Sequence, residues 1–157
     1  MTEESLSGPI RVSHTFRVRY AETDAMGIVH HASYLVWMEM GRTEFMRSFG
    51  FTYSELEKMG VVMPVLEVNV CYKQSSFYDD ELCITTWVEE LSRTKIKLAY
   101  TIVRISDERL LTEGWSLHTF TGLDGRPIRI THHPEAWAKL QMMAPAGDPP
   151  GIMNHEF

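Results

Sequence analysis

Apolar and polar residues alternate over residues 14–20, which read HTFRVRY. Phe16, Val18 and Tyr20 fall on one side of this segment, while Arg17 and Arg19 fall on the other. Because successive side chains of a strand point to opposite faces, the pattern predicts a half-buried strand.

A helical spacing replaces this alternation after a short loop. Between Tyr34 and Phe49, apolar residues recur every three or four positions, which predicts one long helix with a broad apolar face and Ser33 as its cap. Residues 52–60, TYSELEKMG, are typical of a short helix that ends at Gly60.

Four further segments alternate in the way that strands do. The turns SRT and SDER separate the last three, and in the first segment the residues sharing one face are Leu66, Val68, Val70 and Tyr72. We expect four consecutive antiparallel strands that share one buried face, at residues 61–73, 82–91, 95–105 and 110–122.

The order of these elements allows few architectures. A helix that is apolar over so wide an arc needs burial along its length, so we predict an α+β domain in which a curved antiparallel sheet wraps around one central helix. Residues 1–12 would be an N-terminal extension, 13–142 the domain, including a candidate helix at 133–143, and 143–157 a Pro/Gly-rich tail.

Composition and charge narrow the possible functions. A chain of 157 residues with 44% apolar content matches one ordinary domain with a real core. The formal net charge of −6 provides no global positive field for nucleic acid or anionic lipid. A polyanionic ligand would therefore need a local cluster of cations.

Two further features concern the compartment. The start, MTEESLSGPI, lacks the order of a secretory signal, and no apolar run is long enough to span a bilayer, so we expect a cytoplasmic protein. Cys71 and Cys83 lie in alternating segments without CxxC spacing, which indicates reduced, buried thiols.

The loop before the long helix contains a recognisable motif. The stretch VRYAETDAMGIVHHASYLVWMEMGRTEFMR resembles the hotdog-fold acyl-CoA thioesterases of the 4-hydroxybenzoyl-CoA thioesterase and YbgC type, and the likeness extends over nearly all of residues 14–140, including GRPIRI. Glu22 stands where Asp is common in that family, and His30 where Tyr or Phe is frequent. The motif positions in this chain are Glu22, Asp24, Gly27, His30 with His31, Tyr34, and Glu39 with Arg42.

Asp24 has two interpretations. On the residues alone, a loop aspartate is a turn former or cap whose side-chain oxygens accept from nearby backbone N–H groups. The resemblance implies chemistry instead: the carboxylate either attacks a thioester carbonyl to give a mixed anhydride, or deprotonates a water that attacks it. The sequence does not choose between nucleophile and base.

Thioester hydrolysis also needs a donor for the developing oxyanion. Backbone N–H groups at a helix N-terminus suit this task, and the resemblance places the donor at His31. Gly27 would let the loop turn close to the acyl group. His30 either packs or lines the substrate site together with Tyr34.

The histidines do not predict a metal site. Adjacent side chains at a helix start diverge, and neither His118 nor the pair His132 and His133 supplies recognisable ligand spacing. We expect neither a metal nor a redox cofactor, since the coenzyme A would be part of the substrate.

Glu39 and Arg42 lie at a spacing that brings two helical side chains together. The plain interpretation is an ion pair or a solvated helix face. Some hotdog thioesterases carry their catalytic carboxylate on this central helix, so the resemblance makes Glu39 the reserve candidate for the catalytic acid.

An acyl-CoA substrate would need local cations for its phosphates. The resemblance also implies edge-to-edge pairing of sheets, hence at least a homodimer, and we expect a tetramer, with the thioester site near a subunit interface. The candidate phosphate ligands are Lys73, Arg93, Lys95, Lys97, Arg126 and Arg129.

Two other functions compete with acyl-CoA hydrolysis. A hotdog hydratase or dehydratase would use a catalytic histidine with an acid from another helix, whereas here the acid precedes the helix. A non-catalytic acyl-CoA-binding module would bind the same ligand and leave the thioester intact.

Overall fold

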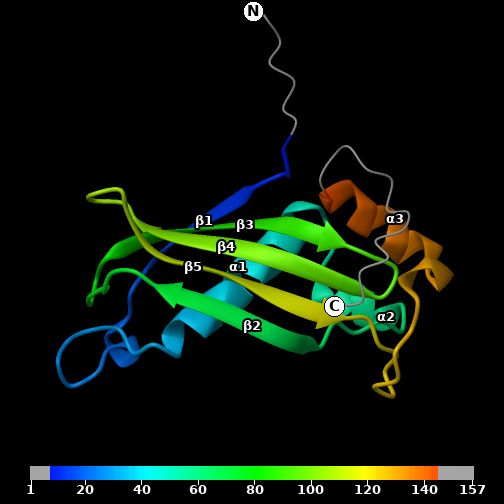
Figure 1. Cartoon of the computed structure of the whole chain (residues 1–157), viewed down its shortest axis with the longest axis horizontal. Helices are drawn as coiled ribbons and strands as arrows, with labels where there is room; N and C mark the ends of the chain where they lie inside the picture. Colours follow the sequence, from blue (N-terminus) through cyan, green and yellow to red (C-terminus); the bar gives the residue numbers. More distant parts are fainter. Residues whose placement is uncertain (1–7, 145–157) are drawn as a thin grey trace, which may run out of the picture.

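The computed structural model describes residues 8–144, in which five antiparallel strands form one curved sheet against a long helix (Figure 1). Helix α1 (Ser33–Ser48) crosses one face of the sheet, and the short helices α2 (Tyr53–Lys58) and α3 (Pro134–Met143) lie together at one end. The strands are β1 (Val12–Arg17), β2 (Val65–Tyr72), β3 (Glu81–Leu91), β4 (Lys95–Arg104) and β5 (Arg109–Thr119).

Close packing between α1 and the sheet depends on Gly41. A Cβ atom at this position would lie 2.7 Å from Ile84 Cδ1 and 2.9 Å from Thr86 Oγ1, so a larger residue would force these two buried side chains to move. The predicted sheet around a central helix is confirmed, with a core that includes Trp37, Phe45 and Met46 of α1 and Ile84, Leu98, Tyr100 and Ile102 of the sheet. None of the helices within residues 8–144 has the length and apolar character needed to cross a lipid bilayer.

The strand order departs from the expected run of neighbours at β2. The order across the sheet is β1, β3, β4, β5, β2, so β2 pairs with β5, with Val68 opposite Ser116 and Tyr72 opposite Thr112. Short turns join β3, β4 and β5, but residues 73–80 between β2 and β3 are too many for a tight hairpin. They carry the chain across the end of the sheet, and the predicted pairing of β2 with β3 is therefore wrong.

Two predicted boundaries also change around the loop. β1 ends at Arg17, and a 3₁₀ turn at Tyr20–Glu22 leaves Tyr20 78% exposed instead of buried. Ser33 is the first residue of α1 and not its cap, because its hydroxyl donates to the Glu22 carbonyl at 3.4 Å. The predicted short helix is confirmed, since α2 is capped by Thr52 and followed by Gly60 at φ +82°.

The face of β2 that looks toward α1 lies open. Val68 and Tyr72 share this face and are 41% and 47% exposed, because α1 packs against β1, β3 and β4. A bulge between Val65 and Glu67 interrupts the alternation at Leu66, which was predicted to share this face. The expected burial of one whole sheet face therefore fails at β2. An edge strand with apolar side chains and unpaired backbone groups is a ready surface for pairing with another chain.

The remaining expectations concern the cysteines and the chain ends. Both thiols are free, but Cys71 is exposed on the other face of β2 and only Cys83 is partly buried, so the prediction of buried thiols is wrong for Cys71. Residues 1–7 and 145–157, which hold most of the predicted extension and tail, lie outside the described residues.

Candidate active site

The loop that holds Asp24 is a small hairpin between the 3₁₀ turn and α1. Thr23 bridges to Val29, the Asp24 N–H donates to the Ile28 carbonyl at 2.8 Å, and the Gly27 N–H donates to the Asp24 carbonyl at 3.0 Å. Gly27 has φ +77°, in the left-handed region that glycine adopts without cost. Its role in this structure is to allow the turn, because no atom lies within 4 Å of a Cβ built there.

The two carboxylate oxygens of Asp24 have different surroundings. Oδ1 accepts from the backbone N–H groups of Met26 at 2.8 Å and Ile28 at 3.2 Å. Oδ2 accepts no hydrogen bond from any residue within 8–144, and the side chain is exposed. Asp24 thus forms the turn with one oxygen, while the other is open to solvent.

The two histidines at the start of α1 also differ. His30 Nδ1 accepts from the N–H of Ala32, the N-cap residue of α1, at 3.2 Å, so neutral His30 carries its proton on Nε2. The His31 carbonyl accepts from the Tyr72 hydroxyl at 2.8 Å, which ties it to β2, while the His31 N–H has no acceptor among the residues described. An unengaged N–H at a helix N-terminus is the donor that an oxyanion requires.

Glu22 is buried, and both of its carboxylate oxygens are engaged. Oε1 accepts from the Arg19 N–H at 2.8 Å, and Oε2 accepts from the Trp37 indole N–H at 2.6 Å. Its backbone carbonyl accepts from the His30 N–H at 2.9 Å. Sequence reasoning identified Glu22 only as a motif position, since the contact with Trp37 depends on how α1 is placed.

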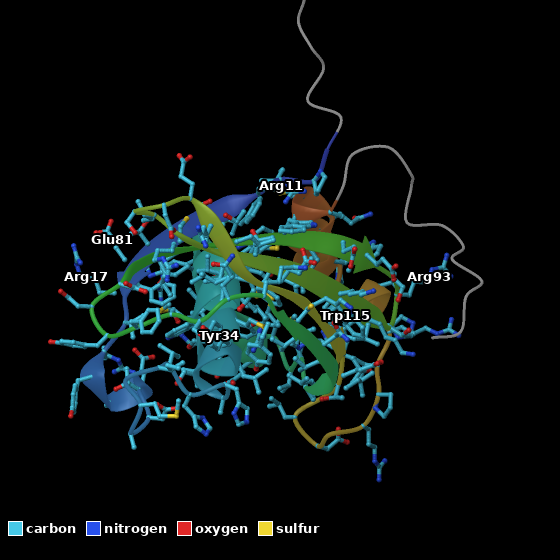
Figure 2. The ribbon with its side chains drawn as sticks, turned by 60° about the vertical axis from the view of Figure 1, so that its left-hand side comes forward. Arg11, Arg17, Tyr34, Glu81, Arg93 and Trp115 are labelled. Atoms are coloured by element: carbon cyan, nitrogen blue, oxygen red, sulfur yellow. The ribbon has the colours of Figure 1, made fainter. Side chains whose placement is uncertain are left out.

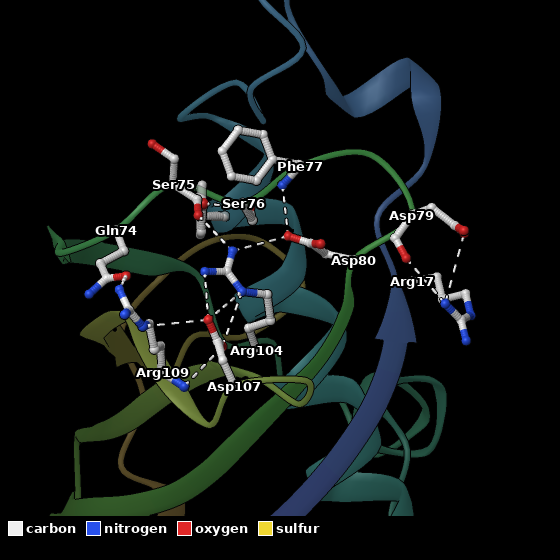
Figure 3. A network of polar contacts seen from close by, with 11 residues as sticks. Arg17, Gln74, Ser75, Ser76, Phe77, Asp79, Asp80, Arg104, Asp107 and Arg109 are labelled. Atoms are coloured by element: carbon white, nitrogen blue, oxygen red, sulfur yellow. Dashed lines mark hydrogen bonds and ion pairs between the residues drawn. The ribbon is translucent and has the colours of Figure 1, made fainter.

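The segment between β2 and β3 supports the loop from the other side (Figure 3). The Ser76 carbonyl accepts from the Val29 N–H at 3.0 Å, and the Ser76 hydroxyl lies 2.7 Å from the Tyr34 hydroxyl. Tyr34 is buried, and burial raises the pKa of its phenol. Its contact with substrate stays a prediction, because in this structure the hydroxyl is used within the fold.

Arg104 holds this same segment in place. Its guanidinium donates to the Ser75 carbonyl at 3.1 Å and to Asp80 Oδ2 at 3.2 Å, and it also pairs with Asp107 (Figure 3). The hydrogen bonds with Arg104 lower the pKa of the Asp107 carboxyl. No sequence pattern distinguishes Arg104 from any other basic residue at a strand end.

Glu39 and Arg42 do not pair. Glu39 is exposed on α1, whereas the half-buried Arg42 guanidinium donates to the Tyr53 hydroxyl at 2.7 Å and to the Tyr100 hydroxyl at 3.2 Å. Burial raises the pKa of Tyr53 to about 12. Of the two plain interpretations, the solvated face therefore applies to Glu39, and its role as the reserve acid stays a prediction.

A chain of polar groups continues from Arg42 into the core. The Tyr100 hydroxyl lies 2.6 Å from Ser116 Oγ, and Ser116 Oγ lies 2.8 Å from His118 Nε2. His118 is fully buried, its Nδ1 lies 3.1 Å from the Met63 carbonyl, and burial lowers its pKa to about 4. His118 is thus a core histidine with its hydrogen bonds satisfied.

Most of the predicted phosphate ligands lie far from Asp24. Figure 2 shows Arg93 at the opposite end of the molecule from Arg17 and Glu81, which flank the start of the Asp24 loop. The main chain joins Arg93 to the 122–130 segment, since the Ile130 N–H donates to the Arg93 carbonyl at 2.8 Å. The end of the molecule opposite the Asp24 loop therefore contains Arg93, Lys95, Arg126 and Arg129.

The other two lysines lie elsewhere. Lys73 follows β2 at the Asp24 end and pairs with Glu113 at 3.3 Å. Lys97 lies on the face of the sheet away from α1, over the ring of Trp115 and 3.5 Å from Glu89. The structure thus does not unite the six predicted cations with Asp24 within one chain.

Comparison with known proteins places these features in a family. Residues 18–152 match the sequence model of the thioesterase-like superfamily. The putative acyl-CoA thioesterase YneP of Bacillus subtilis is 47% identical over 91 residues, which are 58% of this chain and 66% of that protein. The acyl-CoA thioesterase YbgC of Haemophilus influenzae is 34% identical over 95 residues, which are 59% of this chain and 68% of the relative.

A solved structure gives the same result over more of the chain. The DHNA-CoA thioesterase from Staphylococcus aureus has a TM-score of 0.76 and 34% identity, covering 84% of this chain and 91% of the other. The aligned segments of the two curated relatives span about two thirds of their lengths. These matches confirm the predicted fold, family and enzyme class, and the chain belongs to the thioesterase-like superfamily.

Proposed function

We propose that this chain hydrolyses acyl-CoA thioesters, with Asp24 as nucleophile or general base and the His31 N–H as donor to the thioester carbonyl. The observation that carries the proposal is that the two carboxylate oxygens of Asp24 have different surroundings. Two backbone N–H groups hold Oδ1, whereas Oδ2 is exposed and accepts from no described residue. Such a carboxylate is fixed in orientation and still has a lone pair for chemistry.

Both routes give the same products, a carboxylic acid and the thiol of coenzyme A. As nucleophile, Oδ2 bonds to the thioester carbon, the thiolate leaves, and water opens the resulting anhydride. As base, Oδ2 takes a proton from a water molecule that attacks the same carbon. In either case charge develops on the carbonyl oxygen, and an N–H at the start of α1 stabilises it.

The proposal includes a homodimer that pairs β2 with β2. The open, apolar face of β2 supports this, together with its unpaired edge. About a twofold axis, antiparallel pairing places the start of one β2 beside the end of the other. Tyr72 at the end of β2 holds His31, and Val62 before its start bridges to Thr121, which precedes the distal arginines.

This arrangement would unite groups that one chain keeps apart. The partner subunit's Arg126 and Arg129 would approach the Asp24 end of this chain and serve the coenzyme A phosphates. A tetramer built from two such dimers stays our expectation for the full assembly.

Replacement of Asp24 tests the central claim. Asp24→Asn keeps the side-chain size and one accepting oxygen but removes the nucleophile or base, so kcat for thiol release from a panel of acyl-CoA esters should fall by at least about a hundredfold. Asp79→Asn is the matched control: it also lies in an exposed loop, at φ +66°, which asparagine tolerates, and its kcat should be unchanged. Near-normal hydrolysis by a folded Asp24→Asn protein would refute the proposal.

The same assay separates the two competing functions. A hydratase or dehydratase releases no thiol from a saturated acyl-CoA, whereas a thioesterase does. A binding module would retain acyl-CoA esters, detectable by calorimetry, and leave them intact during prolonged incubation.

A further inference from the structure

Glu22 takes no part in the proposed chemistry, yet within residues 8–144 it is the one buried carboxylate, and it lies two residues before Asp24. Only 8% of Glu22 is exposed. A buried carboxylate is costly unless hydrogen bonds replace its lost hydration. Three donors do so here: the Arg19 N–H at 2.8 Å and its Nε–H at 3.3 Å on Oε1, and the Trp37 indole N–H at 2.6 Å on Oε2.

The main chain of the same residue holds the far end of the loop. The Glu22 carbonyl accepts from the His30 N–H at 2.9 Å and from the Ser33 hydroxyl at 3.4 Å. The Glu22 side chain is therefore bonded to Trp37, in the second turn of α1. Its carbonyl is bonded to His30 and Ser33, where the chain enters α1. Asp24 follows two residues later, and the oxyanion donor His31 comes directly after His30.

We propose that Glu22 is a positioning residue, whose carboxylate holds Asp24 and the His31 N–H in register for the reaction. This inference rests on the proposed function. Residues 24–28 are largely exposed and form hydrogen bonds mainly with one another. The position of this loop is therefore set by its anchoring at Glu22 and at Ser76. A displacement of about 1 Å in a reacting group costs about a hundredfold in rate.

Glutamate has the length that this contact needs. One oxygen reaches back to the Arg19 main chain while the other reaches the indole on α1. Aspartate, shorter by one methylene of about 1.5 Å, would satisfy one of these donors and leave the other unpaired.

Two variants remove the hydrogen bond between Glu22 and Trp37, one from each side. In Glu22→Gln an amide NH₂ replaces one accepting oxygen and faces an N–H donor, and in Trp37→Phe the indole donor is lost. Each should lower kcat by about tenfold or more and leave KM within about twofold, because substrate contacts are unchanged. Glu81→Gln is the control: Glu81 is a partly exposed carboxylate at the same end of the sheet that pairs with Arg17, and its kcat should not change.

A double variant distinguishes positioning from loss of folded protein. If Glu22 acts through Asp24, then Glu22→Gln should lower the residual activity of Asp24→Asn by less than about threefold, since one of the two groups to be aligned is already gone. A general loss of folded enzyme would reduce both backgrounds by the same factor. Equal factors would overturn the proposal.

Hydrogen exchange tests, without turnover, whether Glu22 holds the loop in place. Amide exchange of residues 24–31 should accelerate in Glu22→Gln and in Trp37→Phe at temperatures well below unfolding, and the Trp37 indole resonance should shift in Glu22→Gln. Unchanged exchange would overturn the proposal. If Asp24→Asn proves fully active, the proposed function fails, whereas wild-type kinetics in Glu22→Gln beside an inactive Asp24→Asn refutes only the role of Glu22.

Discussion

The geometry of the Asp24 carboxylate is compatible with both of its interpretations, as a turn former and as the proposed catalytic group. Oδ1 forms the turn through the Met26 and Ile28 N–H groups, and Oδ2 is open. If Oδ2 forms an anhydride with the acyl group, Oδ1 becomes the aspartyl carbonyl oxygen and keeps its two N–H donors. Those donors would polarise this carbonyl toward water in the way an oxyanion hole does.

Isotope labelling follows from this geometry. In a single turnover with excess enzyme in oxygen-18 water, we expect a nucleophilic route to leave heavy oxygen on Asp24, because the aspartyl carbonyl is the polarised one. Mass spectrometry of the peptide that contains Asp24 measures this. A general-base route places the label in the product acid alone, and unlabelled Asp24 beside a labelled acid would contradict the anhydride opened at the aspartyl carbonyl.

His118 predicts how stability depends on pH. Its neutral form fits the chain of hydrogen bonds, with Nδ1–H donating to Met63 and Nε2 accepting from Ser116, and burial lowers its folded pKa to about 4 from 6.5. A proton on Nε2 would face the Ser116 hydrogen and oppose the donor direction set by Arg42 through Tyr100. The folded state thus resists protonation.

The sign of the effect follows from proton uptake. Between pH 6.5 and about 4 the unfolded chain binds a proton at His118 that the folded chain does not, so the free energy of unfolding falls as the pH falls, by up to about 3 kcal/mol. Urea unfolding of wild type and His118→Gln at pH 7 and pH 4.5 checks this. His118→Gln should lose less stability over this range, and equal losses would contradict the assignment.

At the scale of elements, the sequence predicts which segments form strands and helices, because local patterns determine them. Alternation and helical spacing identified all five strands and three helices in the described part of the chain, and the motif located the Asp24 loop. The edge position of β2 and the anchoring contacts of Glu22 and Arg104 were not predicted, because these depend on which elements become neighbours. Partner choice between strands is a tertiary property that period-two alternation does not encode.

The uncovered face of β2 allows the proposed association of two subunits to be tested. Val68→Lys places a charge on the apolar face toward α1, so the dimer should dissociate, with a monomeric mass in light scattering at micromolar concentration. Glu67→Lys, on the opposite face of the same strand, is the control and should keep the mass of the wild-type assembly. A monomeric wild-type protein, or a Val68→Lys protein of unchanged mass, would contradict pairing through this edge.

At the scale of the molecule, charge and distance together support the second subunit that the proposed function includes. The net charge of −6 repels coenzyme A, so its phosphates need local cations. Arg93, Arg126 and Arg129 gather beyond the far ends of the strands, and β4 alone, with its 10 residues, spans roughly 34 Å. A thioester at Asp24 of the same chain would leave its phosphates far from these arginines.

Complementation between two defective chains tests whether the site is shared. The Arg126→Ala/Arg129→Ala chain should raise KM for acyl-CoA more than it lowers kcat, with pantetheine esters unaffected, because phosphate contacts serve the ground and transition states alike. Co-expressed with Asp24→Asn and purified through two different tags, it forms mixed dimers. In these, one site combines an intact Asp24 with the partner subunit's intact Arg126 and Arg129, so activity with wild-type KM should return to about half of the sites. A site contained in one chain predicts no such recovery, since each chain would keep its own defect, and mixed dimers that retain the raised KM would refute the shared site.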